Sequence, residues 1–118
     1  MINPGFRFDS IFYYVSDLDR SIDFYTRVLD FPLTSRDAVA RFHIDGVLFE
    51  LVPTEDVSLL SGKGNARLTL AVDDIYAARA SLLGKQVSVS EIQTVSTGLL
   101  AKFADPDNNE IVLWQYAV

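Results

Sequence analysis

The stretch Val15-Ser16-Asp17-Leu18-Asp19-Arg20-Ser21 recurs 57 residues later as Val72-Asp73-Asp74-Ile75-Tyr76-Ala77-Ala78. Both copies follow an alternating apolar run and begin an amphipathic helical pattern. Such a repeat indicates a duplicated architecture, because each half of a 118-residue chain is too short to bury much core alone. We therefore expect the halves to share a core, and two curved units that share a core often leave a cleft.

The same order of elements is predicted in both halves. In the first half we expect a strand over 8–15, a helix that is capped by Ser16 or Asp17 and ends near Asp30, an edge strand over 32–35, and a hairpin over 39–53. In the second half we expect a strand over 66–72, a helix over 74–83 that Gly84 closes, and strands over 87–94, 98–103 and 110–116. The order is β-α-β-β-β twice, in a single domain of module one (about 7–53), a linker (about 54–65) and module two (about 66–118). One buried helical stripe is expected from Leu18, Ile22, Tyr25 and Leu29.

The dipeptide Asp45-Gly46 is typical of a two-residue type I′ hairpin turn, which needs positive φ at both positions. That turn predicts that residue 44 opposes 47, 43 opposes 48, 42 opposes 49 and 41 opposes 50. One face of the hairpin is then wholly apolar, and the other is mixed. Arg41 and Glu50 oppose each other on the mixed face, either as a cross-strand ion pair on a wet surface or as part of a site.

Composition narrows the classes of partner. The net charge is −6, and the sequence has no cluster of Lys and Arg to neutralise a nucleic-acid backbone. It has no cysteine, which excludes disulfides, thiolate metal sites and a cysteine nucleophile, and it has no apolar run of the roughly 18–20 residues that span a bilayer. We expect a cytoplasmic protein with no nucleic-acid or membrane partner.

Four motifs follow one another along nearly the whole chain: Val15-x-Asp17-Leu18-x-x-Ser21-x-x-Phe24-Tyr25-x-x-x-Leu29-x-Phe31, Val47-Leu48-Phe49-Glu50-Leu51, Leu70-x-Val72-Asp73-Asp74 and Phe103-x-Asp105-Pro106-Asp107-x-Asn109-x-Ile111-x-Leu113. With the duplication, they resemble the glyoxalase, bleomycin-resistance and extradiol-dioxygenase superfamily, also called vicinal oxygen chelate proteins. The resemblance implies an α+β fold whose two βαβββ modules form a cupped, mostly antiparallel sheet with helices on the convex side, and it implies a homodimer. Asp30 stands where the family usually has Gly, and Asp tolerates the left-handed conformation better than most residues.

The resemblance also implies four metal-ligand positions, which fall on Ser10, Glu50, Arg67 and Val112. The metal-dependent enzymes of the family fill them with His, Glu or Gln. Here only Glu50 is a good ligand, because valine has no donor atom, arginine repels a cation and serine binds zinc, nickel or manganese poorly. We therefore expect no metal site and no cofactor.

In place of a metal, the cup is expected to hold a small molecule, with aromatic walls and a few charged groups. The expected ligand-binding residues are Ser10, Phe12, Tyr14, Arg41, His43, Leu48, Glu50, Arg67, Thr69, Val112 and Trp114. Phe12, Tyr14 and Trp114 suit a planar or cationic ligand.

Three functions stay open at this point. The first is a metal-independent protein that sequesters or senses a compact aromatic or cationic compound. The alternative is a lyase, isomerase or dioxygenase-like enzyme that uses Glu50 and His43 as catalytic groups, with or without an unusual metal site. The third is a protein–protein module without a small ligand. Structural interpretations stand beside them: His43 as a structural histidine, Trp114 as core packing, and Arg67 as a residue that neutralises Glu50 across the cup.

Overall fold

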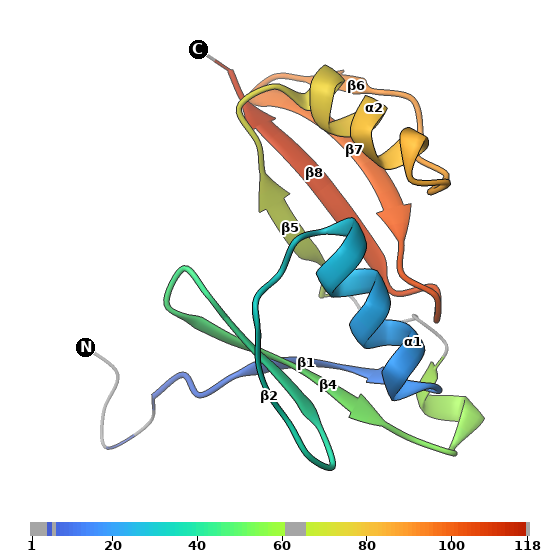
Figure 1. Cartoon of the computed structure of the whole chain (residues 1–118). Coiled ribbons are helices and arrows are strands. Elements are labelled where there is room, and N and C mark those ends of the chain that lie inside the picture. The colour runs from blue at the N-terminus through green and yellow to red at the C-terminus, as the bar shows by residue number, and fades with distance from the viewer. Residues whose placement is uncertain (1–4, 6, 61–65, 118) are drawn as a thin grey trace. The chain divides into compact units, whose positions relative to one another are not determined.

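A computed structural model describes residue 5 and residues 7–60 and 66–117 of the chain (Figure 1). The chain forms two compact units, the N-terminal unit of residues 1–56 and the C-terminal unit of residues 57–118. Each unit contains a four-stranded sheet and one α-helix in the order β-α-β-β-β, which confirms the α+β class and the duplicated module. The single domain, the shared core and the common cup stay predictions. Gly62 and Gly64 of the predicted linker lie outside the described residues.

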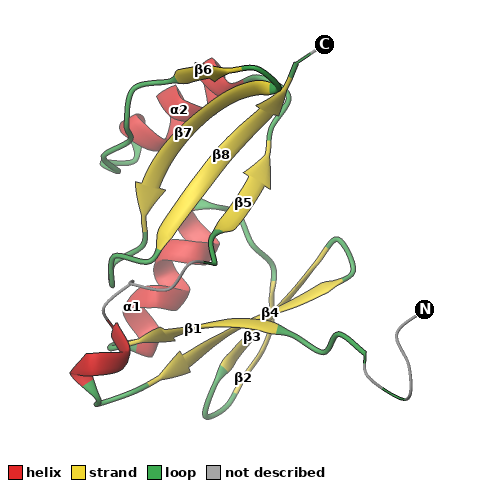
Figure 2. Ribbon diagram, turned by 180° about the vertical axis from the view of Figure 1, so that it is seen from behind, coloured by secondary structure: helices red, strands yellow, loops and turns green. Residues whose placement is uncertain are grey.

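The N-terminal unit consists of β1 (Ile11–Val15), α1 (Leu18–Asp23), the π-helix η1 (Phe24–Val28), β2 (Leu33–Arg36), β3 (Ala40–Ile44) and β4 (Val47–Pro53). Its sheet has the order β1-β4-β3-β2 (Figure 2). The β1–β4 pair is parallel, and the other two pairs are antiparallel. The hairpin register is the one that Asp45-Gly46 predicts, with φ of 52° and 80° at these two residues.

The first helix starts as predicted but continues differently. Asp17 is the N-cap and accepts a hydrogen bond from the Arg20 backbone N–H at 3.0 Å. Ser16, the other candidate for the cap, instead accepts from the Arg20 guanidinium through its Oγ at 2.8 Å, and the Asp19 carboxylate accepts from the Arg36 guanidinium at 2.7 Å. Asp30 adopts the expected left-handed conformation, with φ of 58°.

The predicted buried stripe of this helix is only partly right. Among its four members only Tyr25 is fully buried. The wider turn of η1 changes the helical phase, so that Phe24, Tyr25 and Val28 point inward together. An aromatic core results, in which the ring centroids lie 5.2–6.2 Å apart; its members are Tyr25, Phe31, Phe42 and Phe49.

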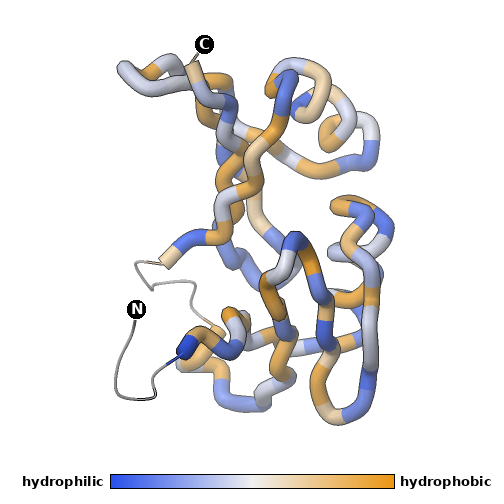
Figure 3. The backbone as a smooth tube through the Cα atoms, turned by 90° about the vertical axis from the view of Figure 1, so that its left-hand side faces the viewer, coloured by the Kyte–Doolittle hydropathy of each residue, from blue (hydrophilic) through white to orange (hydrophobic). Residues whose placement is uncertain are grey.

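The C-terminal unit consists of the 3₁₀-helix η2 (Val57–Leu60), β5 (Leu68–Ala71), α2 (Ile75–Gly84), β6 (Gln93–Val95), β7 (Gly98–Ala104) and β8 (Glu110–Tyr116). Its sheet has the order β5-β8-β7-β6, again with one parallel pair, β5–β8. Asp74 caps α2 as Asp17 caps α1, by accepting from the Ala77 backbone N–H at 3.1 Å. Burial alternates along β4 and β8, as expected for sheets covered on one face, and the backbone of each unit carries both hydrophobic and hydrophilic residues (Figure 3).

Two predictions for this unit are wrong. Gly84 is the last helical residue, and the left-handed residue is Gln86, with φ of 69°. The Gln86 and Val87 N–H groups donate to the Leu83 and Leu82 carbonyls, which is a Schellman motif two residues later than expected. The strand predicted over 87–94 is reduced to β6, because the Ser90 hydroxyl replaces a ladder carbonyl and accepts from the Lys102 N–H at 2.8 Å.

No helix within the described ranges is long and apolar enough to cross a membrane.

Candidate functional site

The sheet of the N-terminal unit has one covered face and one open face. Phe42 and Phe49 pack against Tyr25 of η1 on the covered face. Because side chains alternate along strands, their neighbours point to the other side. We call this side the N-terminal face; it carries the predicted residues Phe12, Tyr14, Arg41, His43, Leu48 and Glu50. The register places Phe12, Glu50 and Arg41 in one row across β1, β4 and β3. Ser10 lies directly before β1.

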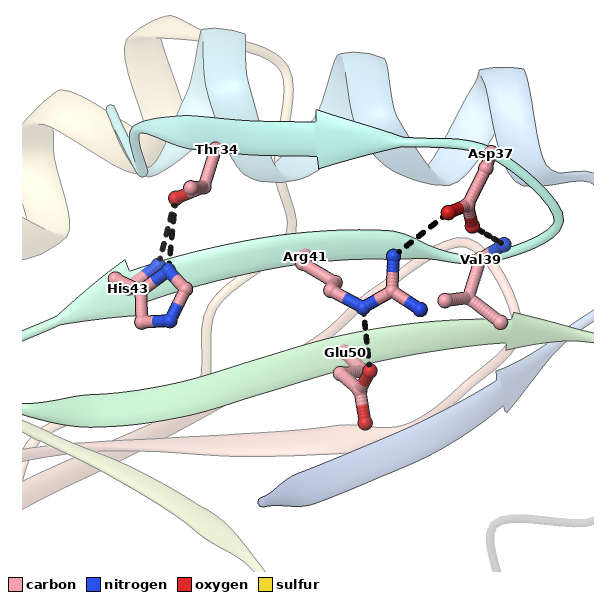
Figure 4. A network of polar contacts seen from close by, with 6 residues as sticks. All are labelled: Thr34, Asp37, Val39, Arg41, His43 and Glu50. Carbon is pink, nitrogen blue, oxygen red and sulfur yellow. Dashed lines mark hydrogen bonds and ion pairs between the residues drawn. The ribbon is translucent and has the colours of Figure 1, made fainter. Parts of the chain in front are cut away.

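Arg41 is the centre of a polar network on the N-terminal face (Figure 4). Its Nε donates to Glu50 Oε2 at 3.1 Å, so the predicted cross-strand pair forms. Its Nη1 donates to Asp37 Oδ2 at 3.0 Å. Asp37 belongs to the tight β2–β3 turn, where its Oδ1 accepts from the Val39 N–H at 3.1 Å. The hydrogen bond from Val39, and then that from Arg41, lower the pKa of the Asp37 carboxyl, and the contact with Asp37 raises the pKa of Arg41.

His43 takes part in a separate contact on the same face. A register irregularity in β2, between Leu33 and Ser35, brings Thr34 beside it. Thr34 Oγ1 accepts from the His43 backbone N–H at 3.1 Å and lies 3.2 Å from His43 Nδ1 (Figure 4). The imidazole thus contacts Thr34 on β2, whereas the Glu50 carboxylate contacts Arg41. An acid–base pair of Glu50 and His43 therefore has no direct hydrogen bond between its members within the described residues.

Thr34 and Asp37 were missed by sequence reasoning. For Asp37 a signal was present, because an aspartate side chain in a turn commonly accepts a hydrogen bond from the backbone N–H two residues later. Asp37 also lies only four residues before Arg41. Thr34 gave no signal, because its position depends on the irregularity in β2.

The open sheet face of the C-terminal unit, which we call the C-terminal face, is less polar. Thr69, Val112 and Lys102 form the row that corresponds to Phe12, Glu50 and Arg41. Trp114 is half-buried and lies edge-to-face on Tyr116, with ring centroids 5.6 Å apart.

Two structural interpretations concern this unit. Trp114 alternates with Ile111 and Leu113, which are the buried core residues of β8, so its ring lies outside that core. Arg67 Nε donates to Glu110 Oε2 at 2.5 Å, so a carboxylate of its own unit pairs with it. The proposed neutralisation of Glu50 by Arg67 stays a prediction.

The four family positions do not fit a divalent metal ion. Glu50 Oε2 already accepts from Arg41, whose positive charge repels a cation beside it. In the C-terminal unit, Arg67 brings a second positive charge and Val112 brings no donor atom. Carboxylate and imidazole donors are what zinc, nickel and manganese prefer, and this set offers one carboxylate.

Comparison with protein families gives one match, in which the Glyoxalase/Bleomycin resistance protein/Dioxygenase superfamily covers residues 7–113. The chain belongs to this superfamily. The comparison with curated proteins gives no match.

Several solved structures of the superfamily share the fold. TnmS3, an antibiotic binding protein from Streptomyces sp. CB03234, is 26% identical, with a TM-score of 0.80 over 98% of this chain and 100% of that chain. A glyoxalase/bleomycin resistance protein from the same organism is also 26% identical, with a TM-score of 0.68 over 91% of this chain and 100% of that one. The fosfomycin resistance protein FosX from Listeria monocytogenes has a TM-score of 0.80 at 15% identity, over 100% of this chain and 97% of its own, and shows likeness of fold alone.

Proposed function

We propose that this superfamily member binds a compact aromatic or cationic small molecule without a metal ion, and thereby sequesters or senses it. The observation that carries the proposal is the hydrogen bond between Arg41 and the Glu50 carboxylate. Glu50 is the one good ligand among the four family positions, and an arginine occupies one of its carboxylate oxygens. A carboxylate in this state serves an organic ligand better than a divalent cation.

The aromatic side chains of the N-terminal face support the same proposal. Phe12 and Tyr14 lie edge-to-face with ring centroids 5.1 Å apart, and Phe12 is 45% exposed. An exposed ring beside a carboxylate is suited to planar compounds and to cations. TnmS3, which is 26% identical along its whole length, is an antibiotic binding protein, and this favours binding over catalysis.

A thermal-shift screen tests the proposal. The protein is mixed with Ni²⁺, Zn²⁺, Mn²⁺ or Fe²⁺ in one arm and with a panel of planar aromatic and cationic compounds in the other. We expect stabilisation by organic compounds and none by metals. Glu55→Ala is the matched control for Glu50→Ala, because Glu55 is an exposed carboxylate of the same unit. Metal stabilisation that is lost in Glu50→Ala and kept in Glu55→Ala would overturn the proposal.

The proposal includes a homodimer in the cytoplasm, as the family resemblance and the cysteine-free sequence indicate. Light scattering during size-exclusion chromatography is expected to give twice the 13.2 kDa mass of the chain. A mass of one chain at every concentration would contradict the dimer, and recovery of the tagged protein outside the cytoplasmic fraction would contradict the location.

A further inference from the structure

The charges on the N-terminal face are not balanced. Arg41 bridges two carboxylates, those of Asp37 and Glu50. With both ionised, one guanidinium and two carboxylates leave one net negative charge. The Glu50 side chain is only 17% exposed, so solvent screens its charge less than it screens the charge of Asp37, whose side chain is 65% exposed.

The geometry leaves one oxygen of Glu50 open. Arginine and carboxylate often pair through two parallel hydrogen bonds. Here Nε of Arg41 donates to Glu50 Oε2 and Nη1 donates to Asp37, and no second hydrogen bond joins the guanidinium to Glu50 within the described residues. Within the described residues Glu50 Oε1 accepts no hydrogen bond. The Glu50 side chain is 17% exposed and Oε1 is not among the fully buried unpaired atoms, so this oxygen can accept a hydrogen bond from an N–H group of a ligand.

We infer that the ligand of the N-terminal face is an organic cation with N–H donors, an amine or an amidine, whose N–H groups donate to Glu50 Oε1. This inference rests on the proposed function and narrows its ligand class. An anion would be repelled by the net negative charge, and the Arg41 guanidinium that could attract it already pairs with Asp37 and Glu50. Phe12, in the same row as Glu50, is placed to contact the apolar part of the ligand.

Asp37 is a positioning residue in this arrangement. Its carboxylate is fixed to the turn by the Val39 N–H, and its backbone N–H donates to the Val39 carbonyl at 3.0 Å. The fixed carboxylate holds Arg41 by Nη1. Without it, the guanidinium is free to rotate and to pair with both oxygens of Glu50, which would close the acceptor that the ligand needs.

The test is a ¹H–¹⁵N NMR titration with three compounds that share one ring: benzamidine, which is a cation, benzamide, which is neutral, and benzoate, which is an anion. We expect benzamidine to shift amides of β1, β3 and β4 and to bind more tightly than benzoate by about tenfold or more. Glu50→Gln and Asp37→Asn are each expected to remove this preference. Asp19→Asn is the matched control, because it removes the same charge and one Asp–Arg contact on α1, and it is expected to keep the preference.

The positioning role has a readout of its own. The Arg41 Nε–H resonance is expected to change on Asp37→Asn and to stay unchanged on Asp19→Asn. Equal binding of the three compounds on this face would overturn the inference and leave small-molecule binding intact. Absence of shifts on this face from all three would also overturn it, and the thermal-shift panel would then decide the proposed function separately. A preference that survives Asp37→Asn would contradict the role of Asp37.

Discussion

Ser21 is the residue of the repeat whose replacement should raise stability. It is 0% exposed on α1, and its Oγ is the one buried side-chain polar atom without a hydrogen-bond partner among the described residues. A buried unpaired hydroxyl costs about 1–3 kcal/mol. Alanine removes that cost and gains about 0.5 kcal/mol of helix propensity, while the small void left by the oxygen costs less than about 1 kcal/mol.

The expected net effect of Ser21→Ala is a stabilisation of about 1–2 kcal/mol, which corresponds to a rise in melting temperature of about 3–10 °C for a chain of this size. Thermal and urea unfolding followed by circular dichroism measure it. The repeat supplies the control, because residue 78, which corresponds to Ser21, is already alanine. Ala78→Ser is expected to lower the stability. If Ser21→Ala instead lowered the melting temperature, the hydroxyl would have a partner and the reasoning would be refuted.

Three further changes test the local structure. Asp74→Ala is expected to lower the free energy of unfolding in urea by about 1 kcal/mol, because it removes the N-cap of α2. An equal effect of Asp73→Ala would contradict the assignment of Asp74 as the cap. Gly98→Ala is expected to lower the free energy of unfolding by at least about 1–3 kcal/mol, because a Cβ there would lie 2.2 Å from the Gln115 carbonyl oxygen. Gly84→Ala has open space around it and is expected to raise the free energy of unfolding by up to about 1 kcal/mol. A higher melting temperature for Gly98→Ala than for Gly84→Ala would refute this. Because the pKa of Asp37 is lowered in the folded state, its stabilising effect is present above its ordinary pKa of 3.8 and is lost as the pH falls through the lowered value. The stability difference between wild type and Asp37→Asn should therefore shrink in acid, and a difference that grows in acid would be inconsistent with the contact.

The sequence predicted best what local chemistry determines. Asp45-Gly46 allows one tight turn, and that turn sets the register and with it the Arg41–Glu50 pair. The cap of α2 and the left-handed Asp30 follow from side chains that act on their own backbone.

Features that depend on packing or on irregular backbone were not predictable in the same way. The π-helical turn of η1 has no periodic signal, and it changes which residues face the core. The short β6 results from one serine hydroxyl that takes the place of a strand carbonyl. For the candidate site, the sequence located the row of Arg41 and Glu50, whereas Asp37 depends on the conformation of a turn.

Metal-independent binding is the central claim, and calorimetry tests it most directly. The dissociation constant of the best compound from the aromatic and cationic panel is measured by isothermal titration in EDTA and again in excess Ni²⁺. Because Arg41 already pairs with Glu50, we expect the same dissociation constant under both conditions. Binding that weakens about tenfold or more in EDTA and returns with Ni²⁺ would contradict the claim.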